Sequence, residues 1–138
     1  MLPGRLRGDA GAATTEMVIV APVLIFTILL IVQAGLYFHA VSVASAAAQD
    51  GARAASIENA AGEPSLAEGR QTAQALLDDL APDLLLGEGV NAQAVGAERV
   101  RVTVTGDVVA VAKFPGFNVN LSVNERSEAV VERFRPDA

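Results

Sequence analysis

The feature that most limits the fold of this chain is a long apolar run near its N-terminus. No charged side chain occurs between Met17 and Phe38. A helix over this run would be roughly 33 Å long, enough to cross a hydrocarbon core of about 30 Å. A helix in a soluble core rarely stays apolar on all sides over such a length. The run predicts a transmembrane helix, assigned to residues 12–39, behind a basic leader of residues 1–11.

The charges beside this run predict its orientation. Arg5 and Arg7 precede it, and the first cation after it is Arg53. Because cations stay preferentially on the cytoplasmic side, we expect a cytoplasmic N-terminus and a C-terminal body outside the cytoplasmic membrane. Tyr37 and His39 would then lie at the outer interface, where amphipathic rings are favoured.

Two alternative interpretations remain open. The segment Val43–Ala48 offers signal-peptidase-like sites, so that cleavage near Ala48 would release a secreted soluble domain. However, the apolar run is longer than the roughly 7–15 residues usual for a signal peptide, and Glu16 and Pro22 fit such a peptide poorly. The other alternative is an unprocessed single-pass membrane protein with an external binding module.

Glu16 directly precedes the apolar run, and it needs a counter-charge if it enters an apolar helix bundle. If a peptidase cuts after Gly11, Ala12 gains an α-amine that is largely protonated at neutral pH. Ala12 and Glu16 are four residues apart, on one helix face, so the amine could neutralise the carboxylate in its own or a neighbouring chain. Pro22 removes a helical hydrogen bond to Val18 and marks a candidate helix bend.

The segment Gly11–Glu16 resembles the processing site of type IV prepilins, in which a prepilin peptidase cuts after glycine and glutamate is the fifth mature residue. The longer segment Gly8–Pro22, together with Gln33–Gly35 and Asp50–Ala55, resembles TadE-like proteins, which are small pilin-like components of tight-adherence pilus systems. The resemblance covers residues 8–56. Where the family often carries Glu-Phe-Gly near the end of the span, this chain has Gln33-Ala34-Gly35.

This resemblance implies a minor pilin or pseudopilin that acts in the assembly or structure of a pilus or related secretion filament. Gly11 and Ala12 would form the processing site, and Glu16 would guide subunit register by charge pairing. The implied partners are a prepilin peptidase, other pilin-like subunits and membrane lipid. The mature chain would stay in the cytoplasmic membrane or join a cell-surface filament.

After the span, residues 40–62 are expected to extend the N-terminal helix, because they are rich in alanine. Small residues recur on one face of this extension and would allow another helix to approach closely. They are Ala44, Ala48, Ala52 and Ala55. Gly51 would weaken the helix, Asp50 and Arg53 would pair across one turn, and Gly62 and Pro64 would end it.

Residues 63–138 are expected to form a small external headpiece. Ser65 and Glu68 have the spacing of a capping box that opens a second, amphipathic helix. Its apolar face would comprise Ala73, Leu76, Leu77, Leu80 and Leu84. We interpret the acidic group of Asp78, Asp79 and Asp83 as a solvated helix end rather than a cation site, because it lacks the spacing of a binding loop.

From residue 98 the apolar period changes to two, which predicts strands. Val100, Val102 and Val104 would form a buried face packed on the leucines of the second helix. Gly106-Asp107 has the form of a type II′ turn that would bring Val109 opposite Val104. A third strand is expected over residues 119–134. The predicted class is α+β, with a three-stranded antiparallel sheet.

The composition argues against several other functions. The chain has no cysteine and one histidine, and no catalytic triad, phosphate-binding glycine loop or metal-ligand spacing is recognisable. Its net charge of −6 argues against a nucleic-acid partner. We therefore expect no enzyme activity, no cofactor, no metal and no small-molecule substrate.

Overall fold

The computed structural model describes residues 9–59, 62–111, 116 and 120–132. The described elements are α1 (Asp9–Ser56), α2 (Leu66–Leu80), β1 (Leu85–Val95), β2 (Arg99–Val108) and β3 (Leu121–Val130). They confirm the α+β class with a long apolar N-terminal helix, a second helix and a three-stranded antiparallel sheet. Residues 1–8 of the predicted leader lie outside the described residues, as do residues 119, 133 and 134 of the predicted third strand.

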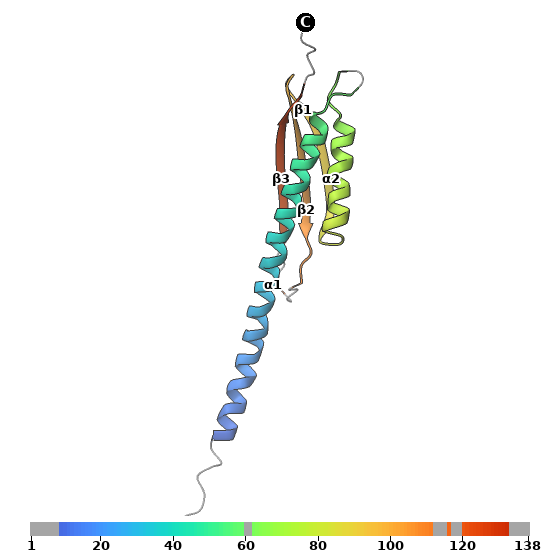
Figure 1. Ribbon diagram of the computed structural model, residues 1–138. Coiled ribbons are helices and arrows are strands. Elements are labelled where there is room, and N and C mark those ends of the chain that lie inside the picture. The colour runs from blue at the N-terminus through green and yellow to red at the C-terminus, as the bar shows by residue number, and fades with distance from the viewer. Residues whose placement is uncertain (1–8, 60–61, 112–115, 117–119, 133–138) are drawn as a thin grey trace, which may run out of the picture.

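Helix α1 runs through two different surroundings (Figure 1). Its N-terminal part extends alone, and its C-terminal part packs against the sheet and α2. At 48 residues it is roughly 72 Å long, about twice the length of a membrane span. Pro22 lies inside the continuous helix and does not end it. One helix therefore joins an uncovered apolar segment to the core of the headpiece.

The sheet has the strand order β1-β2-β3, and both pairings are antiparallel. The central strand β2 alternates between a buried and an outward face, as its sequence predicts. Val100, Val102 and Val104 on the inner face are fully buried. They share one core with Leu77 of α2 and with the small residues of α1, so the predicted packing on the leucine face is only part of the contact.

The small-residue face of α1 packs closely against α2 and the sheet. Ala44, Ala48, Ala52 and Ala55 are at most 1% exposed, which confirms that they pack together with the headpiece. At the crossing of α1 and α2, a Cβ added to Gly51 would lie 2.7 Å from the carbonyl oxygen of Gly69. Gly51 therefore has a packing role that outweighs its low helix propensity.

Helix α1 ends at Ser56, earlier than the expected residue 62. The backbone of Ser56 accepts a hydrogen bond from the amide of Glu132, and Ile57 forms an isolated parallel bridge with Glu132. Pairing with the segment after β3 thus replaces another turn of helix. Glu58 in turn bridges Pro64, which leads the chain into α2.

Helix α2 is shorter than its apolar pattern suggests. Ser65 occupies the N-cap position but makes no side-chain capping hydrogen bond, so the expected capping box does not form. The helix ends at Leu80, where Ala81 still donates to the carbonyl of Leu77 before Pro82 stops further helical bonding. Leu77 is buried, whereas Leu80 is 48% exposed and faces away from the core.

The predicted hairpin at Gly106-Asp107 is wrong. Both residues lie inside β2 and pair with Val123 and Ser122 of β3. Val104 pairs with Val90 of β1 on one side and Glu125 of β3 on the other, not with Val109.

The turn lies earlier, between β1 and β2, where Gly96 adopts a φ of 71°. Sequence reasoning missed β1, because the segment holds glycines, alanines and Asn91, which have low strand propensity. Long-range pairing with β2 outweighs that local preference.

We expect Gly69→Ala to destabilise the protein. Its new Cβ would lie 2.5 Å from the Cβ of Ala55 and 2.6 Å from the carbonyl oxygen of Gly51. Overpacking of this kind costs about 1–3 kcal/mol. The matched control is Gly35→Ala, also in a helix, whose Cβ meets nothing within 4 Å. Thermal melting of the detergent-solubilised chain should fall clearly for Gly69→Ala only. Equal melting of the two variants would contradict the close crossing.

Candidate functional site

The residues predicted to form the processing site lie at the start of α1. Gly11 and Ala12 are in its first turn, and Glu16 follows one turn later. Glu16 is exposed, as is Pro22 further along the helix. The helical backbone therefore keeps the four-residue spacing that would let an amine on Ala12 approach the carboxylate of Glu16 on one face.

The apolar segment that follows is uncovered. Large apolar side chains from Met17 to Val32 are exposed on all sides of α1, with Met17, Val18 and Ile19 at 66–69%. An 18-residue window of this helix has a mean hydropathy of 2.7, and only 6% of it is buried. Within the described part of the chain, α1 is the one helix long and apolar enough to cross a membrane. A helix from a soluble core would be mostly buried instead.

Gln33 marks the point where α1 meets the headpiece. It is 4% exposed, although it belongs to the apolar run. Its Nε2 donates to the carbonyl oxygen of Val109 at 3.2 Å, and its Oε1 accepts from the amide of Val111 at 2.8 Å. Sequence reasoning noted no role for Gln33. The available signal was an amide side chain inside an otherwise apolar run, but its partners are 76 and 78 residues away.

A protein-family model matches this part of the molecule. Residues 11–53 match the family model described as TadE-like protein. This segment is TadE-like. The match begins at Gly11 and ends within the last turn of α1, so it includes Glu16, the apolar segment and Gln33 but not the sheet.

The other two comparisons return no relatives. No curated protein and no solved structure matches the chain. The TadE-like assignment therefore rests on the N-terminal helix, and the headpiece is interpreted from its own geometry.

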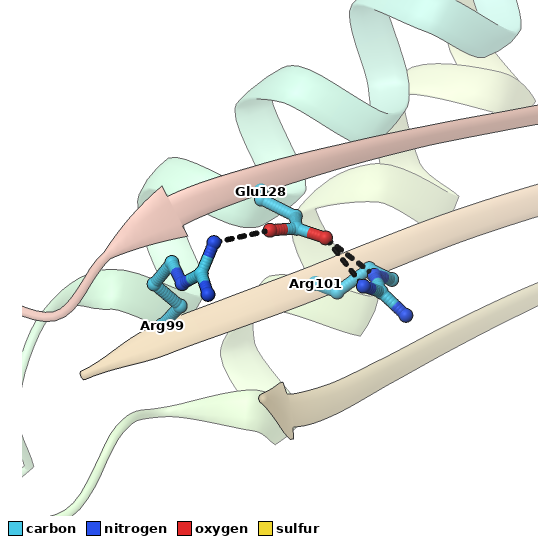
Figure 2. Close-up of polar contacts among 3 residues, drawn as sticks. All are labelled: Arg99, Arg101 and Glu128. Carbon is cyan, nitrogen blue, oxygen red and sulfur yellow. Dashed lines mark hydrogen bonds and ion pairs between the residues drawn. The ribbon is translucent and has the colours of Figure 1, made fainter. Parts of the chain in front are cut away.

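The outward face of the sheet carries a small charged cluster. Glu128 of β3 lies between Arg99 and Arg101 of β2 (Figure 2). Arg101 donates through Nε to Oε1 of Glu128 at 2.7 Å, and Nη1 of Arg99 lies 3.4 Å from Oε2. Arg101 and Glu128 occupy paired positions in the β2–β3 register. The cluster links two strands on a solvated face, where such pairs contribute little to stability.

The acidic group of Asp78, Asp79 and Asp83 spans the last turn of α2 and the segment after it. Among the described residues, no group of three or more histidine, aspartate or glutamate side chains could hold a metal ion. Asp78 and Glu88 instead accept hydrogen bonds from the amide of Gln74, at 3.3 and 2.7 Å. The bond to Asp78 lies within α2, and the bond to Glu88 joins α2 to β1.

We expect Glu128 to titrate below its ordinary range. The hydrogen bond from Arg101, assisted by the positive charges of Arg101, Arg99 and Arg126, lowers the pKa of Glu128 and outweighs desolvation, which raises it. Because the folded-state pKa is lowered, the pairing is present above the unfolded-state pKa and is lost as the pH falls through the folded-state pKa.

NMR titration of the carboxyl carbon measures this pKa directly. Arg101→Gln should raise it clearly, whereas Arg126→Gln, which removes only a weaker through-space attraction, should raise it less. Equal effects of the two substitutions would contradict the assigned hydrogen bond.

Proposed function

We propose that this chain is a minor pilin or pseudopilin that acts in a tight-adherence pilus or a related secretion filament. In this proposal a prepilin peptidase cuts the membrane-inserted precursor between Gly11 and Ala12. The observation that carries the proposal is the TadE-like match from Gly11 onward, on a helix whose apolar segment is uncovered. An uncovered apolar helix needs an apolar environment, which lipid provides before assembly and neighbouring helices provide in a filament.

The charges along the chain support an insertion with the N-terminus in the cytoplasm. Arg5 and Arg7 precede the apolar segment, and no further cation occurs before Arg53. In this orientation the peptidase meets the leader on the cytoplasmic side, and the headpiece lies outside the cytoplasmic membrane.

Cleavage would also change the charge at the start of α1. An exposed apolar helix can leave lipid for a helical bundle at little cost, because neighbouring helices are as apolar as lipid chains. The carboxylate of Glu16 is the exception, since an unpaired charge is costly in such a bundle. The new α-amine of Ala12 would supply a counter-charge of fixed position. Pairing between subunits would then favour one axial register.

The packing of α1 argues against the secreted alternative. Cleavage near Ala48 would remove Ala40, Val43, Ala44 and Ala47 from the chain, and all four are at most 5% exposed in the core. The released domain would lose one side of its core. The unprocessed alternative differs in another way, because it predicts that replacement of Gly11 has no effect on function.

The proposed role is structural rather than enzymatic. It involves binding to lipid, to the peptidase and to other pilin-like subunits. It requires no cofactor, no metal, no nucleic acid and no small-molecule substrate.

Replacement of Gly11 tests the processing step. We expect Gly11→Leu to accumulate as the full-length precursor in membranes of cells that hold the peptidase, because a bulky side chain would block the cut. The matched control is Gly8→Leu, which changes another glycine of the leader and should be processed normally. Immunoblots of membrane fractions separate the two forms by size. Normal shortening of Gly11→Leu, or failure of both variants, would contradict a cut specified by Gly11.

Neutralisation of Glu16 tests the charge pairing. We expect Glu16→Gln to be inserted and cleaved but strongly depleted from sheared filaments, because the side chain no longer attracts the new amine. Glu63→Gln is the control, since Glu63 is an exposed carboxylate of the headpiece. Quantitative immunoblots of sheared filaments and membranes give the incorporated fraction. Incorporation of Glu16→Gln at the control level would remove the register role.

A further inference from the structure

The Gln33 side chain forms hydrogen bonds with the backbone just after β2, as a neighbouring strand would. Strand β2 ends at Val108, and the amide of Val109 still donates to the carbonyl of Leu84. The carbonyl of Val109 and the amide of Val111 come next along the chain. Gln33 bonds both with its own amide group. A residue on a parallel strand bonds two partners separated in this way. The contact therefore holds the C-terminal end of β2 against α1.

The side-chain amide of Gln33 is fully paired at this junction. An amide side chain in hydrocarbon is costly when its donor and acceptor have no partners. Here both ends of the Gln33 amide are bonded, and no buried side-chain nitrogen or oxygen among the described residues lacks a partner. Gln33 thus gives the headpiece a polar contact that does not require solvent.

The uncovered part of α1 is short for a membrane span. From Met17, just after the charge of Glu16, to Val32, just before the junction, the helix is roughly 24 Å long. The hydrocarbon core of a bilayer is about 30 Å thick. The missing length is about one helical turn, which corresponds to residues 33–36. If Glu16 stays at the inner boundary, the outer boundary lies near Leu36, beyond the Gln33 junction.

Helix α1 and the segment after β2 both present exposed apolar side chains at this level. Phe38 is 68% exposed and Val111 is 47% exposed. The rings of Tyr37 and Phe38 lie edge to face with centroids 5.9 Å apart, and aromatic residues are enriched where a span meets water. Asp107 stands two residues before Val109 on the strand, about 7 Å further from the span. The charge of Asp107 would therefore meet headgroups rather than hydrocarbon.

We propose that the headpiece of the unassembled protein rests on the outer surface of the bilayer, with the Gln33 junction inside the hydrocarbon boundary and Phe38 and Val111 in contact with lipid. The partner of this surface is the lipid bilayer. Gln33 is a positioning residue, because its bonds to Val109 and Val111 hold the apolar end of the sheet at that depth. The inference rests on the membrane insertion in the proposed function.

Depth measurements test the contact in the full-length protein. The chain has no cysteine, so each substitution introduces a single thiol for a fluorophore. The protein is reconstituted in zwitterionic phosphatidylcholine vesicles that contain lipid with a nitroxide on the upper acyl chain. Val111→Cys is compared with Val130→Cys, another exposed valine, which pairs with Arg99 at the far end of the sheet. Ile25→Cys reports on insertion of the span itself.

The proposal predicts strong quenching at position 111 and none at position 130, with quenching at position 25 by nitroxides placed deeper in the acyl chain. Quenching at position 25 without quenching at position 111 would overturn the docking and leave the insertion intact. Absence of quenching at position 25 would overturn both the docking and the insertion on which it rests.

A substitution at Gln33 tests the positioning role. Gln33→Leu keeps the run apolar but removes both bonds, so quenching at position 111 should fall by roughly twofold or more while quenching at position 25 stays unchanged. The matched control is Thr27→Leu, because the Thr27 hydroxyl bonds only the carbonyl of Val23 within α1 among the contacts described. Thr27→Leu should leave position 111 unchanged. Equal quenching at position 111 in the Gln33→Leu, Thr27→Leu and parent proteins would contradict the positioning role of Gln33.

Discussion

The close contact between the small residues of α1 and the rest of the headpiece is the constraint on which the structure depends. Alanines and Gly51 on α1 let α2 approach until Gly69 and Gly51 nearly touch, and they let Val102 reach the same place from the sheet. The core is therefore thin and made of short side chains. Because α1 forms one side of this core, the headpiece is not an independent domain attached to a helix.

Gln33 divides this single helix into two parts with different chemistry. From Met17 to Val32, α1 is apolar on all sides and uncovered. After Gln33, one face carries small buried residues, and charged residues such as Asp50 and Arg53 are exposed. One continuous helix joins the proposed processing site to the headpiece. Any force that extracts the apolar part from lipid acts on the headpiece through the same helix.

Sequence patterns predicted those parts of the structure that depend on local order. The apolar run, the alanine face and the alternation of Val100, Val102 and Val104 all depend on residues close in sequence, and the structure contains each of them. Strand β1 and the true course of β2 depend on pairing between distant segments. The turn signal at Gly106-Asp107 yielded to pairing with β3, which a local pattern does not contain. The role of Gln33 could not be predicted for the same reason, since its partners are 76 and 78 residues away in the sequence.

The central claim is that the Gly11–Ala12 bond is cut and that the new α-amine is the counter-charge of the Glu16 carboxylate. The TadE-like match begins at Gly11, and Ala12 and Glu16 lie four residues apart in α1. The most direct test is the intact mass of the wild-type chain extracted from membranes of its native cells. The account predicts a mature chain that begins at Ala12. A chain that keeps residues 1–11, or one that begins beyond residue 40, would contradict it.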